Sequence, residues 1–168
     1  MYSNNSIPYQ DPQHAREVSQ GKSIITLLGV QDYQKTHQAM QHYTKNRTAK
    51  DPDQIWLVEH PPIYTKGKRS KKSDIIKPLH APILETDRGG EITYHGPGQL
   101  VGYFLINLTQ HKELGLKNLV DKLEETLIET LDFYGLKGYN NEKNRGIYLN
   151  QDKIASIGLR VKNHCSYH

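Results

Sequence analysis

The chain has 168 residues and a formal net charge of +4. This length suits one domain with its own hydrophobic core. The mildly basic charge allows an acidic macromolecular partner without identifying one. The single cysteine, Cys165, excludes an internal disulfide framework and a CxxC metal site. It also indicates a reducing compartment, which we expect to be the cytoplasm.

The N-terminal stretch is polar and carries Pro8 and Pro12. It lacks the basic segment followed by an apolar segment that marks a signal peptide. Because so polar a stretch buries little apolar surface, residues 1–22 are predicted to form a disordered tail. The folded domain is expected over residues 23–168. No apolar run is long enough to cross a bilayer, so no membrane contact is expected.

The folded part begins with a β-branched, apolar segment at residues 23–30, which predicts a first strand. Asp32 is placed to cap a helix over residues 33–47. Apolar residues over 99–108 predict a strand in the centre of a sheet. Shorter strands are predicted over residues 55–60, 63–65 and 83–87.

Residues 116–134 carry the strongest helical pattern, with Gly135 in position to end the helix. Its apolar positions recur at helical spacing: Leu116, Leu119, Val120, Leu123, Leu127, Ile128 and Leu131. Residues 146–149 and 153–161 predict a hairpin around residues 150–152. The order of elements indicates an α+β fold, a mixed β-sheet flanked by helices.

One stretch, residues 88–103, places five glycines and Pro97 between apolar segments. Glycine loses the most chain entropy on ordering, so such density suggests a backbone that approaches something closely. The interleaved strand residues argue against a flexible linker. The stretch is predicted to be a hairpin or a strand–turn–strand unit that forms the wall of a pocket.

Three residues are candidates for chemistry. His95 lies inside the glycine-rich stretch, and Lys153 begins an apolar strand, where its charge would favour a nearby thiolate. Cys165 is the only thiol, but i, i+3 spacing on a strand argues against pairing it with His168. The nine histidines show no metal-ligand spacing, and no metal or other cofactor is expected.

The one dense basic cluster covers residues 66–72, with Lys77 just beyond it. It lacks the interleaved aromatic residues of a platform for single-stranded nucleic acid, so no nucleic-acid partner is expected. A solvated loop and a docking patch for an acidic protein both remain open.

Four separated blocks resemble the octanoyl-(acyl-carrier-protein):protein N-octanoyltransferases in the same order: residues 55–62 (IWLVEHPP), 87–103 (DRGGEITYHGPGQLVGY), 146–148 (GIY) and 153–160 (KIASIGLR). The resemblance implies the fold of the lipoate and biotin protein ligase catalytic domain. It also implies transfer of an octanoyl group from acyl carrier protein to a lysine of lipoyl domains. The acceptors would be the lipoyl domains of 2-oxoacid dehydrogenases and the glycine cleavage H protein.

The same resemblance implies the residues of the site. Lys153 falls at the family's catalytic lysine. The acyl pocket would be lined by Arg88, Gly89, Gly90, Glu91, Ile92, Thr93, Tyr94 and His95, and by Ser156, Ile157 and Gly158. The basic cluster, residues 66–77, would then help to dock acyl carrier protein.

The sequence departs from the family pattern in one respect. The cysteine that takes the acyl group lies in the family in a later, Asn-Pro-Cys-type segment, and Cys165 aligns with a different position. We therefore expect a chain that lacks the C-terminal part of the domain, and its activity stays open. A non-catalytic remnant that binds acyl groups or carrier protein, and an adenylating enzyme like lipoate ligase, remain as alternatives.

Overall fold

A computed structural model describes residues 16–20, 23–77, 80–111, 114–141 and 146–168. The chain forms two compact units, residues 1–107 with 159–168 and residues 108–158. Among the described residues, no helix is both long and apolar enough to cross a membrane.

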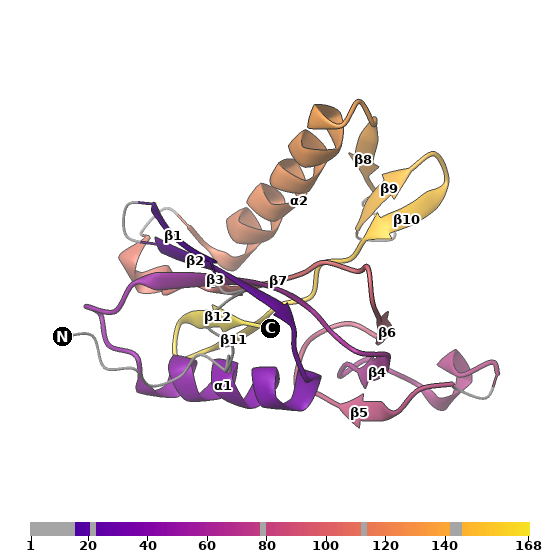
Figure 1. The fold of residues 1–168 in the computed structure, drawn as a ribbon, viewed down its shortest axis with the longest axis horizontal. Coiled ribbons are helices and arrows are strands. Elements are labelled where there is room, and N and C mark those ends of the chain that lie inside the picture. The colour runs from indigo at the N-terminus through magenta and orange to yellow at the C-terminus, as the bar shows by residue number, and fades with distance from the viewer. Residues whose placement is uncertain (1–15, 21–22, 78–79, 112–113, 142–145) are drawn as a thin grey trace. The chain divides into compact units, whose positions relative to one another are not determined.

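The first unit is built on a four-stranded mixed sheet in the order β1-β2-β3-β7 (Figure 1). Its strands are β1 (Arg16–Gln20), β2 (Ser23–Val30), β3 (Asp53–Glu59) and β7 (Val101–Leu105). The pair β2–β3 is parallel, and the pairs β1–β2 and β3–β7 are antiparallel. A parallel pair needs a crossover, which helix α1 (Tyr33–Asn46) provides.

Helix α1 begins where the sequence predicts, because the Asp32 carboxylate accepts a hydrogen bond from the Lys35 amide at 2.9 Å. Its buried residues recur at intervals of three and four, as one face of a helix requires: Tyr33, Thr36, Met40 and Thr44. This face meets the core of the sheet, which consists of Leu28, Met40, Trp56, Val58, Tyr103, Leu105 and Tyr167.

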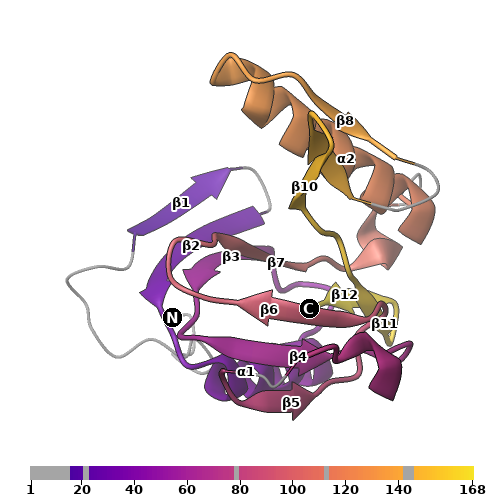
Figure 2. The ribbon, with the colours of Figure 1, turned by 90° about the vertical axis from the view of Figure 1, so that its right-hand side faces the viewer.

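A second, three-stranded sheet in this unit has the order β5-β4-β6 (Figure 2). Its strands are β4 (Ile63–Lys66), β5 (Ile83–Glu85) and β6 (Ile92–His95), and a short 3-10 helix, η1 (Lys72–Asp74), lies between β4 and β5 in sequence. The unit closes with the hairpin β11 (Arg160–Lys162) and β12 (Cys165–Tyr167). Strand β12 lies against the end of β7, where the Ser166 amide donates to the Ile106 carbonyl at 2.9 Å.

The second unit contains helix α2 (Leu116–Phe133) and an antiparallel sheet in the order β10-β9-β8. A 3-10 turn, η2 (Leu108–Gln110), precedes the helix. The strands are β8 (Gly138–Asn140), β9 (Ile147–Leu149) and β10 (Asp152–Ala155), and α2 lies along β8 and β9. The helix that the apolar pattern of residues 116–134 predicts is confirmed. Only Leu119 on it is fully buried.

The structure differs from the sequence predictions in three places. Residues 16–20 form β1 through ladder pairing with β2, although disorder was predicted; the rest of that predicted tail lies outside the described residues. Strand β7 ends the order of the four-stranded sheet instead of lying in its centre. The predicted strand 153–161 is interrupted at residues 156–159, so β10 and β11 belong to different sheets.

The glycine-rich stretch takes the second of its two predicted forms. It is a strand–turn–strand unit and not a hairpin, because β6 pairs with β4 while β7 pairs with β3. The Gly98 amide within the turn donates to the Glu59 carboxylate at 2.8 Å, which fixes the turn to the end of β3. The stretch therefore connects the two sheets of the first unit.

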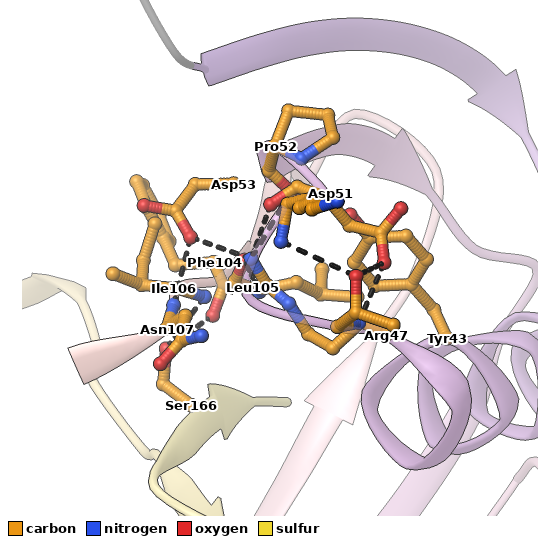
Figure 3. A network of polar contacts seen from close by, with 12 residues as sticks. Tyr43, Arg47, Asp51, Pro52, Asp53, Phe104, Leu105, Ile106, Asn107 and Ser166 are labelled. Carbon is orange, nitrogen blue, oxygen red and sulfur yellow. Dashed lines mark hydrogen bonds and ion pairs between the residues drawn. The ribbon is translucent and has the colours of Figure 1, made fainter. Parts of the chain in front are cut away.

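A buried ion pair holds the main sheet to α1 (Figure 3). The Arg47 guanidinium lies 2.9 Å from the Asp53 carboxylate, and their side chains are only 2% and 3% exposed. Arg47 also donates to the Leu105 carbonyl at 2.8 Å, and the Asn107 amide donates to Asp53 at 2.7 Å. The pair thus fixes the end of α1, the start of β3 and the end of β7 at one point.

Replacing Arg47 with Met should destabilise the fold by about 3–5 kcal/mol, because the Asp53 carboxylate would stay buried without its cation. Urea unfolding measures this loss. The control is Glu85→Gln in the exposed pair with Lys66, which should leave the stability almost unchanged. Equal losses for the two variants would contradict the role assigned to the buried pair.

Candidate active site

The most distinctive polar feature of the first unit is a cluster of aromatic and imidazole rings in its interior. It joins Tyr33 and His37 of α1, His60 after β3, His95 of β6, Tyr103 of β7 and His168 after β12. The Tyr33 ring lies at its centre, 5.1 Å from His60 and 5.7 Å from His95 by ring centroids. Five separate segments of the chain thus meet here.

Hydrogen bonds fix the tautomers of two of these histidines. His60 Nδ1 lies 2.7 Å from the Gln31 carbonyl, which only accepts, so this nitrogen carries the proton. His60 Nε2 therefore accepts from the Tyr103 hydroxyl at 2.8 Å. By the same reasoning, His95 Nδ1 donates to Gln99 Oε1 at 2.8 Å, and His95 Nε2 is left as an acceptor.

Burial keeps three of these imidazoles neutral, those of His60, His95 and His168. Burial lowers the pKa of His95 to about 4, although its hydrogen bond to Gln99 acts in the opposite direction. Burial also lowers the pKa of His168 to about 3, and the neighbouring His37 adds to this effect. The pKa of His60 is lowered for the same reason, against the effect of its Gln31 bond. These three rings therefore offer neutral donors and acceptors near pH 7.

Arg88 has a structural task that the sequence did not reveal. It is 5% exposed and donates to both the carbonyl and the hydroxyl of Thr65 at 2.8 Å. It also donates to the Gly89 carbonyl at 2.9 Å. These bonds use the guanidinium to join β4 to the glycine-rich stretch.

Asp87 connects α1 to the closing hairpin. The Tyr167 hydroxyl donates to Asp87 Oδ2 at 2.5 Å, and His37 Nε2 lies 3.4 Å from Oδ1. Burial alone would raise the pKa of Asp87, but the Tyr167 bond and the nearby His37 outweigh it and lower that pKa. Asp87 is therefore an anion at neutral pH at the border of the ring cluster.

The alternation of side chains along β6 divides the predicted pocket residues. His95 is buried in the ring cluster, and Thr93 shares its face of the strand. Ile92 and Tyr94 point to the opposite face, and Tyr94 is 38% exposed. A pocket at the ring cluster can thus use Thr93 and His95, whereas Tyr94 belongs to the outer surface.

Lys153 lies in the second unit, near the start of β10. Its ammonium lies 5.9 Å from the centre of the Tyr148 ring. A Cβ on Gly146 would lie 2.3 Å from Lys153 Cε and 2.6 Å from the Ala155 carbonyl, and Gly146 has a φ of +141°. The absence of a side chain at Gly146 therefore leaves the space that the lysine side chain occupies.

The remaining predicted pocket residues, Ser156, Ile157 and Gly158, follow β10 in a segment without regular structure. They belong to the second unit with Lys153, whereas the residues from Arg88 to His95 belong to the first. The predicted site residues therefore form two groups, one in each unit.

Cys165 does not have the properties of an acyl acceptor. It is 4% exposed, and burial raises the pKa of its thiol. Its charged neighbours are Arg47 and Asp53, whereas His168 hydrogen-bonds to Tyr33 at 2.6 Å. The two residues have different surroundings, in agreement with the sequence argument against a Cys165–His168 dyad. Within the described residues, no three His, Cys, Asp or Glu side chains are arranged to hold a metal ion.

The sequence did not single out Tyr33, His60 or Tyr103, which build the ring cluster together with His95. One signal was available for His60, which stands between a buried strand and two prolines. The sequence pattern around Tyr33 and Tyr103 is that of ordinary core residues. Only their meeting in space gives them a place in the site.

The fold is that of the lipoate ligases. A bipartite lipoate protein ligase from Thermoplasma acidophilum matches with a TM-score of 0.65 at 14% identity, over 89% of this chain and 59% of that one. A lipoate-protein ligase A structure with bound ATP matches with a TM-score of 0.62 at 13% identity, over 89% of this chain and 64% of that one. The chain thus spans less than two thirds of either solved structure.

Sequence relatives define the family more closely. The lipoyl protein ligase A/B catalytic domain model matches residues 32–168. Octanoyltransferases from Shewanella sediminis and Histophilus somni are each 44% identical, over 90% and 86% of this chain. The chain belongs to the lipoyl protein ligase A/B catalytic domain family, on the octanoyltransferase side. It spans 68% of the length of each of these two relatives.

Replacing Gly67 with Ala should destabilise the first unit by about 1–3 kcal/mol. The new Cβ would lie 2.4 Å from the Gly90 carbonyl and 2.7 Å from the Arg88 guanidinium. Urea unfolding measures the loss. Gly89→Ala is the matched control, because its Cβ meets nothing closer than the Leu159 carbonyl at 3.7 Å. Similar stabilities of the two variants would rule out the close packing at Gly67.

Acid should weaken the fold well before the carboxylates titrate. Between about pH 6.5 and 4 the unfolded chain protonates His95 and His168 while the folded chain does not, so stability must fall as pH decreases. Each of the two should contribute about 2 kcal/mol between about pH 7.5 and pH 5. Urea titrations at both pH values measure the difference, and His168→Phe should reduce it. A stability that does not change over this range would refute the neutral, buried state of these rings.

Proposed function

We propose that the chain belongs to an octanoyltransferase that moves an octanoyl group from acyl carrier protein to a lysine of lipoyl domains. The 44% identity to an octanoyltransferase over about nine tenths of the chain carries this proposal. The acceptors would be the lipoyl domains of 2-oxoacid dehydrogenases and the glycine cleavage H protein, in the cytoplasm. The bipartite ligase of Thermoplasma acidophilum is described together with its E2 lipoyl domain, which supports this class of acceptor.

The overall reaction is an acyl transfer without a redox step. The C–S bond of the donor thioester breaks, and a C–N bond to the acceptor lysine forms. Overall, the departing thiolate takes up the proton that the acceptor amine loses. Such a reaction needs a positioned base or cation, donors for the developing oxyanion and a dry slot for the acyl chain.

The described residues offer parts that suit these tasks. Lys153 supplies a side-chain ammonium that can exchange a proton with the acceptor amine. For the acyl slot, the first unit offers Thr93, His95 and the backbone of Gly89 and Gly90. Burying the methylenes of an octanoyl chain at ~0.8 kcal/mol each would contribute roughly 5 kcal/mol of binding.

A second candidate, an adenylating ligase, has the solved ligase structures on its side, one of which holds ATP. Those matches are only 13–14% identical and show the fold alone. Transfer from free octanoate that depends on ATP would favour the ligase. Transfer from octanoyl-acyl carrier protein without ATP would favour the transferase.

The direct test incubates the purified chain with octanoyl-acyl carrier protein and an unmodified lipoyl domain, and follows octanoylation of the domain by mass spectrometry. We expect ATP-independent transfer. Replacing Lys153 with Met should lower the rate about 10²–10⁴-fold, as loss of a positioned proton-transfer group does. Gly146→Ala should also lower it, because the new Cβ would displace the lysine side chain. The control is Gly115→Ala, whose Cβ meets nothing within 4 Å. A Lys153→Met chain that is as fast as the original would refute the role of this lysine.

A further inference from the structure

We propose that the outer face of the β5-β4-β6 sheet and the basic loop beside it form the docking surface for an acidic protein, the carrier of the acyl donor. This inference rests on the proposed function, because that function supplies the partner. The surface consists of Tyr64, His80, Ile83, Tyr94, Lys68, Arg69, Lys71 and Lys72.

The apolar half of this surface comes from strand register. Ile83, Tyr64 and Tyr94 face one another across the three strands, so their side chains share one face of the sheet. Ile83 is 40% exposed and Tyr94 38%. His80 completes a group of three rings whose centroids are 5.0–5.4 Å apart, and the Tyr64 hydroxyl lies 3.1 Å from His80 Nδ1. Large exposed rings beside an exposed isoleucine are typical of the centre of a protein interface.

The charged half is the loop that follows β4. Lys68, Arg69, Lys71 and Lys72 are all exposed. Lys66, by contrast, is engaged by Glu85 at 2.9 Å. Such a group of cations beside an apolar centre would attract an acidic partner and orient it during encounter.

The loop is also bonded directly to the glycine-rich stretch of the site. The Lys68 amide donates to the Arg88 carbonyl at 3.0 Å, and the Arg69 amide donates to the Gly90 carbonyl at 2.9 Å. Tyr94 on the outer face is followed by His95 in the ring cluster. A partner docked on this face would therefore lie next to the backbone that borders the site.

A nucleic acid is the other class of partner that rings and cations together can bind. The geometry favours a protein. The three rings are tilted by 51–77° and pack on each other, so they do not form a row of open faces for stacked bases. The exposed Ile83 adds apolar surface with no use in phosphate binding.

The test measures the affinity of the chain for octanoyl-acyl carrier protein by calorimetry at low salt. Changing Lys68, Arg69, Lys71 and Lys72 together to Ser should weaken binding at least about tenfold. The matched control changes four other exposed lysines to Ser, Lys35, Lys45, Lys50 and Lys117, which removes the same charge elsewhere. It should shift the affinity less than about threefold. Ile83→Glu should weaken binding more than its control, Val30→Glu. Val30 is likewise an exposed β-branched residue, but it lies on β2.

Equal effects of the loop variant and its control would overturn the proposal, as would a chain that does not bind carrier protein. Binding of a single-stranded oligonucleotide that is lost in the loop variant but kept in the control would overturn it too. Octanoyl transfer by the unchanged chain from a small thioester, octanoyl-pantetheine, tests the proposed function separately. Absent transfer with intact, loop-dependent carrier binding would refute the function and leave the docking surface standing.

Discussion

The Arg47–Asp53 ion pair is the constraint on which the first unit depends. It joins the end of α1, the start of β3 and the end of β7, and both side chains are almost completely buried. A buried charge without its partner is costly, so these three segments are held in one arrangement. The ring cluster needs the same arrangement, since Tyr33 begins α1, His60 follows β3 and Tyr103 lies on β7. The energetic anchor and the polar interior of the candidate site therefore share their supporting elements.

The glycine-rich stretch connects the two sheets of the first unit. Arg88 binds it to β4, and the turn after β6 is bound to Glu59 at the end of β3. Along β6 the buried His95 and the exposed Tyr94 point in opposite directions. One continuous sequence motif thus contains residues with different tasks, one directed to the interior and one to an outer surface.

Much of the local structure was predictable. The cap at Asp32, both helices and most strands follow from capping chemistry and apolar periodicity, which depend on near neighbours in sequence. The pairing of strands was not predictable, because it depends on contacts between segments that are distant in sequence. Thus β1 was missed, β7 was placed in the centre of the sheet, and β10 and β11 were read as one strand. The family followed from four sequence blocks, and the sequence relatives confirm it.

By itself, the sequence determined the fold class, the family and the candidates His95 and Lys153, because these depend on residue type and order along the chain. The tertiary structure decided what several of these residues do. In the folded chain, Arg88 donates hydrogen bonds to β4, and Cys165 is buried near Arg47. The rings of Tyr33, His60 and Tyr103 lie in one cluster with His95. Burial and distance between remote segments set hydrogen-bond partners and pKa values, and neither can be read from one segment alone.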